Sequence, residues 1–91
     1  MPTNKHKFMG LKYSLLYLDV PLDELYGNCS PPYEKPRQIS INSNLSGPHE
    51  LEIYIHEALH ALDWDAREWK VKQSAKDIAK FLTTLGYVRG E

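Results

Sequence analysis

The chain has 91 residues and a mass of 10.5 kDa, enough for one domain and too short for two independent cores. With 42% hydrophobic and 25% charged residues, its composition is that of a folded globular protein and not of a disordered one. Its 11 basic and 12 acidic residues give a net charge of −1. This balance argues against phosphate-driven nucleic-acid binding as the main role.

Cys29 is the only cysteine, which excludes a disulfide framework and a cysteine-rich zinc motif and favours a reducing compartment. The longest apolar stretch, residues 13–20, is interrupted by Ser14 and Asp19 and is too short to span a membrane or to serve as a convincing signal sequence. We therefore expect a cytoplasmic protein, in the cell that produces it or in its host, without a membrane partner.

The first half of the chain predicts little regular structure. Residues 1–10 have no apolar period and are expected to form a loose arm, ahead of a single compact domain of residues 11–91. Residues 11–18 are rich in aromatic and aliphatic side chains and are compatible with either a strand or a helix. Three prolines place residues 28–36 in a loop. Residues 37–42 alternate polar and β-branched residues, which predicts a half-buried strand short enough to be a sheet edge.

Two helices are predicted in the second half. Ser46 and Pro48 indicate a helix start, and apolar residues recur at helical spacing over residues 48–62: Leu51, Ile55, Ala58, Leu59 and Leu62. A second stripe ends before Gly86, a typical helix stop: Val71, Ala75, Ile78, Leu82 and Leu85. Only residues 63–65 separate the patterns, so the helices are expected to form an antiparallel hairpin. With the strand, they predict an α+β fold in which the hairpin packs on a small sheet or a β-hairpin.

The first of these helices contains the pattern H-E-x-x-H at residues 56–60. On a helix, His56 and His60 project from one face a turn apart, close enough to bind one Zn²⁺, and Glu57 lies beside them within reach of a metal-bound water. The alternative is that these residues are merely polar side chains on a solvated helix surface. The independent evidence for a helix at this position favours the metal site.

A hydrolytic zinc site needs a third protein ligand, and no histidine follows His60. Glu68 lies three residues before Val71, on the stripe expected to face the first helix close to the turn, and is the first choice. Asp65 and Asp63 are the substitutes. The spacing Asp65-x-x-Glu68 also fits a capping box, in which Glu68 would cap its helix. Asp63, three residues after His60, is expected to orient an imidazole ring.

At these residues the chain resembles a small zincin-type metallopeptidase of phage and bacterial genomes, loosely similar to the SprT-like and ImmA-like proteins. The resemblance covers about residues 36–88, and H-E-x-x-H is its specific motif. It implies a minimal zincin-like fold, zinc held by His56, His60 and a downstream residue that maps to Glu68, and Glu57 as general base. It also implies an edge strand that aligns the peptide, which maps to residues 37–42 and hence to the substrate-binding residues Arg37, Ile39 and Ile41.

The function expected on these grounds is zinc-dependent hydrolysis of peptide bonds in a peptide or protein substrate, with Glu57 moving the proton. A tyrosine is the natural second donor to the oxyanion, and the sequence leaves four candidates open: Tyr26, Tyr33, Tyr54 and Tyr87. The main alternative is a zinc-binding structural or interaction protein with little or no turnover, for example a phage accessory subunit. A peptidase normally needs a cleft with walls on both sides of the metal, and so short a chain leaves little for the second wall. A second copy of the chain in a homodimer, or a phage or host protein, is a candidate to supply it.

Nucleic-acid binding through the lysines of the last helix is a further, weaker alternative, because such lysines usually only solvate a helix face. The lysines concerned are Lys70, Lys72, Lys76 and Lys80.

Overall fold

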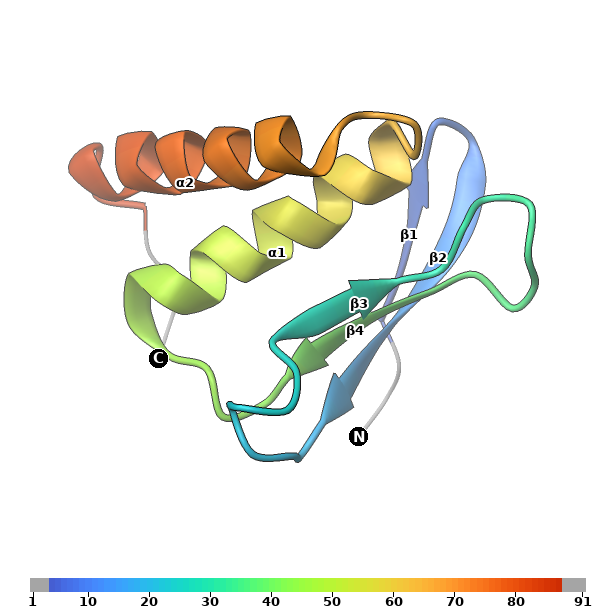
Figure 1. Ribbon diagram of the computed structural model, residues 1–91, viewed down its shortest axis with the longest axis horizontal. Coiled ribbons are helices and arrows are strands. Elements are labelled where there is room, and N and C mark those ends of the chain that lie inside the picture. The colour runs from blue at the N-terminus through green and yellow to red at the C-terminus, as the bar shows by residue number, and fades with distance from the viewer. Residues whose placement is uncertain (1–3, 88–91) are drawn as a thin grey trace.

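The computed structural model describes residues 4–87, which form an α+β fold of a four-stranded mixed sheet and two helices. Figure 1 shows three layers: the sheet, helix α1 (Gly47–Leu62) across one of its faces, and helix α2 (Glu68–Thr84) on the outer side of α1. Among the described elements, α2 contacts α1 and no strand. The predicted α+β class is confirmed, and α1 is covered on two sides.

Strands β1 (Asn4–Phe8) and β2 (Leu11–Leu18) form an antiparallel hairpin. Met9 and Gly10 make its two-residue turn, with φ angles of 52° and 80°. The aromatic ring of Phe8 stacks edge-on against Tyr13 of β2, with ring centroids 5.7 Å apart. The prediction of a loose arm is therefore wrong for residues 4–8, while residues 1–3 lie outside the described part. Residues 11–18, for which the sequence left strand and helix open, form a strand.

Strand β4 (Gln38–Asn42) lies inside the sheet, whose order is β1-β2-β4-β3. It pairs in parallel with β2 and antiparallel with β3 (Gly27–Cys29). The prediction that residues 37–42 form an edge strand is wrong, because β3, which the sequence placed partly in a loop, covers that side of β4. The edge of the sheet next to α1 is therefore the three-residue strand β3.

The hydrophobic core lies between the sheet and α1. Its buried members are Tyr13, Cys29, Ile39, Ile41, Leu45, Ile53 and Ala61. Asn42, 1% exposed, anchors the preceding loop to this core: its Nδ2 donates to the carbonyl oxygens of Val20 at 3.0 Å and Leu25 at 2.7 Å. These bonds to a buried side chain hold residues 20–25 beside the N-terminal half of α1.

Helix α1 has Ser46 as N-cap and Pro48 in its first turn, as predicted. Its fully buried residues are Ile53, Glu57 and Ala61, four residues apart. The stripe predicted from the apolar period is only half-buried and ends at Leu62, which is 45% exposed. The prediction missed the buried stripe because α1 is covered by both the sheet and α2, and the most enclosed of its faces includes a glutamate.

Helix α2 buries small side chains against α1: Val71, Ala75 and Ala79. Ile78 and Leu85, expected on the buried stripe, are 38% and 57% exposed. Gly86, with a φ angle of 93°, ends the helix as predicted. The N–H of Tyr87 donates to the carbonyl of Leu82 and that of Gly86 to Thr83, which is a Schellman motif.

Neither described helix combines the length and the apolar character needed to cross a lipid bilayer.

Candidate metal centre

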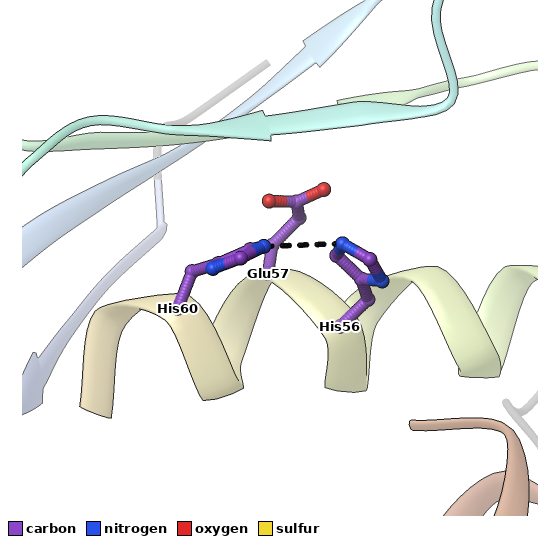
Figure 2. A group of neighbouring side chains, drawn as sticks. All are labelled: His56, Glu57 and His60. Carbon is purple, nitrogen blue, oxygen red and sulfur yellow. Dashed lines mark hydrogen bonds between the residues drawn. The ribbon is translucent and has the colours of Figure 1, made fainter. Parts of the chain in front are cut away.

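His56 and His60 lie one turn apart on α1, and their Nε2 atoms are 3.2 Å from each other (Figure 2). Together with Glu57, they form a group whose candidate ligand atoms all lie within 4.8 Å of one another. The three residues are therefore close enough to hold a metal ion. This arrangement follows from the i, i+4 spacing on a helix, as the sequence predicted.

Glu68, the first residue of α2, reaches across to both histidines. Its Oε1 lies 3.1 Å from Nε2 of His56, and its Oε2 lies 3.1 Å from Nε2 of His60. Arg67 is the N-cap of α2 and no side chain caps that helix end, so the capping box with Asp65 does not form. The tight turn between the helices thus brings Glu68 to the histidines.

The donor set and its spacing fit a divalent metal ion. Two imidazole nitrogens and a carboxylate are ligands that zinc takes in hydrolytic sites. Donors about 2.0–2.1 Å from a tetrahedrally bound zinc lie about 3.3–3.4 Å from one another. Each imidazole meets a different oxygen of Glu68, and these two separations of 3.1 Å and the 3.2 Å between the imidazole nitrogens agree with this spacing within a few tenths of an ångström.

The electrostatics of His56 also suit a metal ligand. Burial lowers the pKa of its imidazole, an effect that the nearby charge of Glu68 partly opposes. A histidine must be neutral to coordinate a metal, because the lone pair is otherwise occupied by a proton. The environment therefore keeps His56 in the form that binds.

Glu57 is the buried acid of the site, only 6% exposed. Its carboxylate points from α1 towards β3 (Figure 2), where a Cβ on Gly27 would lie 3.0 Å from its Oε2. Residues 4–87 make no hydrogen bond to this carboxylate, whose oxygens keep slight contact with solvent. Burial, and secondly the charge of Glu68, raises the pKa of Glu57 to about 7. A carboxyl group with a pKa near neutrality is suited to accept and return a proton.

Two pockets meet at the site, and Gly27, His56 and Glu57 line both. One, which we call the loop pocket, has a volume of about 430 Å³ and lies between residues 22–26 and the N-terminal half of α1. The other, the turn pocket, has a volume of about 400 Å³ and is lined by residues 28–29 and by residues near the helix–helix turn, including Trp64. Together they form a cleft beside β3.

The residues predicted to bind substrate do not lie in this cleft. Ile39 and Ile41 are 5% and 0% exposed and belong to the core, because β4 is paired on both sides. Arg37 precedes β4 and its Nε donates to the carbonyl of Pro32 at 2.8 Å. The assignment of Arg37, Ile39 and Ile41 as substrate-binding residues is therefore corrected: the sheet edge in the cleft is β3.

The other acidic candidates lie apart from the three donor atoms. Asp63 is exposed and is the C-cap of α1, where its backbone N–H donates to the carbonyl of Leu59. Within the described residues, its side chain makes no hydrogen bond to an imidazole. Asp65 is exposed in the turn. Of the three acids considered as the third ligand, Glu68 is the one whose carboxylate contacts both histidines.

Of the four tyrosines considered, Tyr26 lines the loop pocket. Tyr54 instead shares a hydrogen bond with Tyr17, and Tyr33 and Tyr87 are 77% and 64% exposed. Of the four tyrosines that the sequence left as candidates for the second oxyanion donor, Tyr26 is therefore the one we retain.

Several cleft residues were missed from the sequence. Gly27 and Asn28 belong to a strand of three residues, too short to produce a period. Trp64 was not among the predicted site residues, yet its ring centroid lies 6.0 Å from that of His60, and the residue lines the turn pocket. The one signal for it in the sequence was its position four residues after His60, which a continuing helix would place on the same side. No protein-family model, curated protein or solved structure matches this chain.

Proposed function

We propose that this protein is a zinc-dependent peptidase with a minimal zincin-like fold. The observation that carries the proposal is the contact of three donors, His56, His60 and Glu68, at 3.1–3.2 Å beside the buried acid Glu57. Structural metal sites are closed by four protein ligands, whereas hydrolytic sites have three and leave one position open. Three protein donors next to an unpaired carboxyl favour a hydrolytic role over a purely structural one.

In the proposed reaction the chain supplies a metal scaffold and a proton carrier. When bound, zinc supplies Lewis-acid activation of water and polarisation of the scissile carbonyl. Glu57 accepts the proton of the attacking water and then donates it to the leaving amine. Tyr26, which lines the cleft, is the candidate donor to the oxyanion.

Strand β3 supports recognition of an extended peptide. The N–H of Ser30 donates to the carbonyl of Gln38, and that of Asn42 donates to Tyr26. By the alternation of an antiparallel ladder, the backbone groups of Gly27 and Cys29 point away from β4, towards the free edge. The N–H of Cys29 donates to Oδ1 of Asn28 at 3.0 Å, so a substrate strand would have to replace that bond. We propose that a substrate adds to this edge as a further strand, the role that the sequence assigned to residues 37–42.

The test compares the unmodified chain with the Glu57→Gln variant, both loaded with one equivalent of zinc. The unmodified protein is expected to cleave casein, an unstructured protein, and to lose this activity with a chelator. Glu57→Gln is expected to bind zinc equally and to cleave at least about a hundredfold more slowly. Zinc binding without cleavage by either protein would instead support a zinc-binding structural or interaction protein, such as a phage accessory subunit. Equal cleavage by both would refute the role of Glu57.

A further inference from the structure

The loop pocket opens directly onto His56 and Glu57, and its volume of about 430 Å³ has room for a long side chain. Part of its wall is apolar and consists of Leu22, Leu25 and Ile53. Arginine and lysine bury their aliphatic stems against such surfaces while keeping their charged ends near polar groups. The apolar wall is therefore compatible with a long amphipathic side chain.

The same pocket carries an excess of acidic side chains. Asp23 and Glu24 belong to the loop before β3, and Glu52 belongs to α1. Within the described residues, none of these three acids forms an ion pair. Lys72 of α2 is the one lysine or arginine that lines the pocket, whereas four acidic residues line it when Glu57 is counted. This imbalance favours an incoming cation and disfavours an incoming anion.

An aromatic ring adds a second feature that suits a cation. Tyr26 is 47% exposed, and its ring is held against that of His49, with centroids 4.7 Å apart and an interplanar angle of 79°. Guanidinium and ammonium groups are attracted to the faces of such rings. The loop that carries Tyr26 is fixed by the bonds from the buried Asn42 to Val20 and Leu25. The backbone of this loop is thus held in place before a ligand arrives.

The inner end of the pocket points independently to a ligand. Glu57 is 6% exposed, lines this pocket and makes no hydrogen bond to the described residues. Buried polar groups are normally hydrogen-bonded, and the slight exposure that this carboxylate keeps is towards a cavity. A ligand that fills the loop pocket next to the metal site can therefore reach it.

We propose that the loop pocket binds a long basic side chain of the substrate, arginine or lysine, and so makes the cleft selective for basic peptides. This inference rests on the proposed peptidase function, because it treats the pocket as part of the substrate cleft. The apolar wall holds the stem, the rim formed by Asp23, Glu24 and Glu52 attracts the charge, and the face of Tyr26 contacts the head group.

The test is a binding measurement that does not depend on turnover. Two fluorescent heptapeptides of alanine and serine, which differ only in a central arginine or its neutral analogue citrulline, are titrated with zinc-loaded Glu57→Gln protein. The arginine peptide is expected to bind about fivefold to tenfold more tightly. A triple variant at the rim, Asp23→Asn, Glu24→Gln and Glu52→Gln, is expected to lose the difference. A control with the same charge change outside the pocket, Glu34→Gln, Asp63→Asn and Asp65→Asn, is expected to keep it.

Equal affinity for the two peptides, a preference that survives in the rim variant, or no measurable binding of either peptide would overturn the inference. Hydrolysis of the same peptides by the unmodified protein separates it from the proposed function. An arginine preference without hydrolysis would leave the pocket in place and refute the peptidase. Hydrolysis of both peptides at equal rates would support the peptidase and refute the selectivity of the loop pocket for basic side chains.

Discussion

Two glutamates of the candidate site lie in opposite environments. Glu57, in the middle of α1, is 6% exposed, faces β3 and makes no hydrogen bond within the described residues. Glu68, at the start of α2, has a side chain that is 63% exposed, and its carboxylate contacts His56 and His60. Burial raises the pKa of Glu57 to about 7. We therefore propose different roles for the same functional group: proton carrier where it is buried, and metal ligand where it meets the imidazoles.

The largest expected effect tests whether Glu68, and not Glu57, belongs to the metal site. Zinc at a thousandfold excess over its dissociation constant adds about 4 kcal/mol to the free energy of unfolding. For a domain of this size, this raises the melting temperature by about 15 °C or more. The unmodified protein and Glu57→Gln are expected to show this rise, measured by circular dichroism against a chelated sample.

At the same zinc concentration, Glu68→Gln is expected to lose most of the rise and His60→Ala nearly all of it, because each removes a donor. If zinc raised the melting temperature of Glu68→Gln as much as that of the unmodified protein, Glu68 would not be a zinc ligand.

The second prediction concerns the pH dependence of stability in the metal-free protein. The pKa of Glu57 rises from 4.5 in the unfolded chain to about 7 in the fold, so between these values the folded state retains a proton that the unfolded state has released. Its contribution to stability is therefore present below pH 4.5 and is lost as the pH rises through 7. The loss is about 3 kcal/mol, since each pKa unit corresponds to about 1.4 kcal/mol.

Urea unfolding with chelator from pH 4 to pH 8 measures this loss. Glu57→Gln is expected to equal the unmodified protein near pH 4 and to exceed it in stability at pH 8, whereas Glu34→Gln, an exposed control, is expected to follow the unmodified curve. Parallel curves for the unmodified protein and Glu57→Gln would contradict the raised pKa.

A smaller effect is expected at the strand that Glu57 faces. In Gly27→Ala the new Cβ would lie 2.9 Å from Cγ2 of Ile53 and 3.0 Å from Oε2 of Glu57. The first contact is closer than a Cβ atom tolerates, and a backbone oxygen, that of Ser40, lies 3.1 Å away on the same strand pair, so the variant is expected to lose about 1–3 kcal/mol of unfolding free energy. Asn28→Ala, at an exposed position of the same strand, removes only the acceptor of one hydrogen bond from the Cys29 N–H and is expected to cost less, about 0.5–1 kcal/mol. Equal urea midpoints for the two variants would mean that Gly27 does not pack closely against the side chains of α1.

The smallest effect concerns Cys29, which is buried beside Glu57. Burial, and to a lesser degree the charge of Glu57, raises the pKa of the Cys29 thiol to about 12. Removing that charge in Glu57→Gln is expected to speed iodoacetamide alkylation of the metal-free protein at pH 8 about twofold to threefold, because more thiolate forms. Glu68→Gln is expected to leave the rate unchanged. If alkylation became faster in Glu68→Gln and not in Glu57→Gln, the charge that raises the pKa of the Cys29 thiol would be that of Glu68, contrary to the expectation.

Parts of the site were predictable because they depend on local spacing. His56, Glu57 and His60 lie within five residues of one helix, and Glu68 follows after a turn too short to take it elsewhere. The predicted helix boundaries at Ser46 and Gly86 depend on local capping and are confirmed. The apolar stripes of both helices were less predictable, since burial depends on which neighbours cover each face.

Strand order could not be deduced in the same way. Residues 37–42 have the alternation of a half-exposed strand, yet β2 and β3 cover both of their edges. The pairing partner on one side is a three-residue strand, Gly27–Cys29, which has no sequence signature of its own. The misassignment of Arg37, Ile39 and Ile41 as substrate-binding residues followed directly from this error.

The sequence by itself determined that His56, Glu57 and His60 share one turn of a helix with Glu68 close by, because helical periodicity and a short turn fix the relative positions of residues that are near in the chain. The tertiary structure decided what surrounds those ligands: which strand forms the cleft edge, why Glu57 is buried, and how residues 22–26 create an acidic pocket beside His56. These features depend on contacts between segments tens of residues apart, whose pairing is chosen by the packing of the whole core and leaves no local pattern.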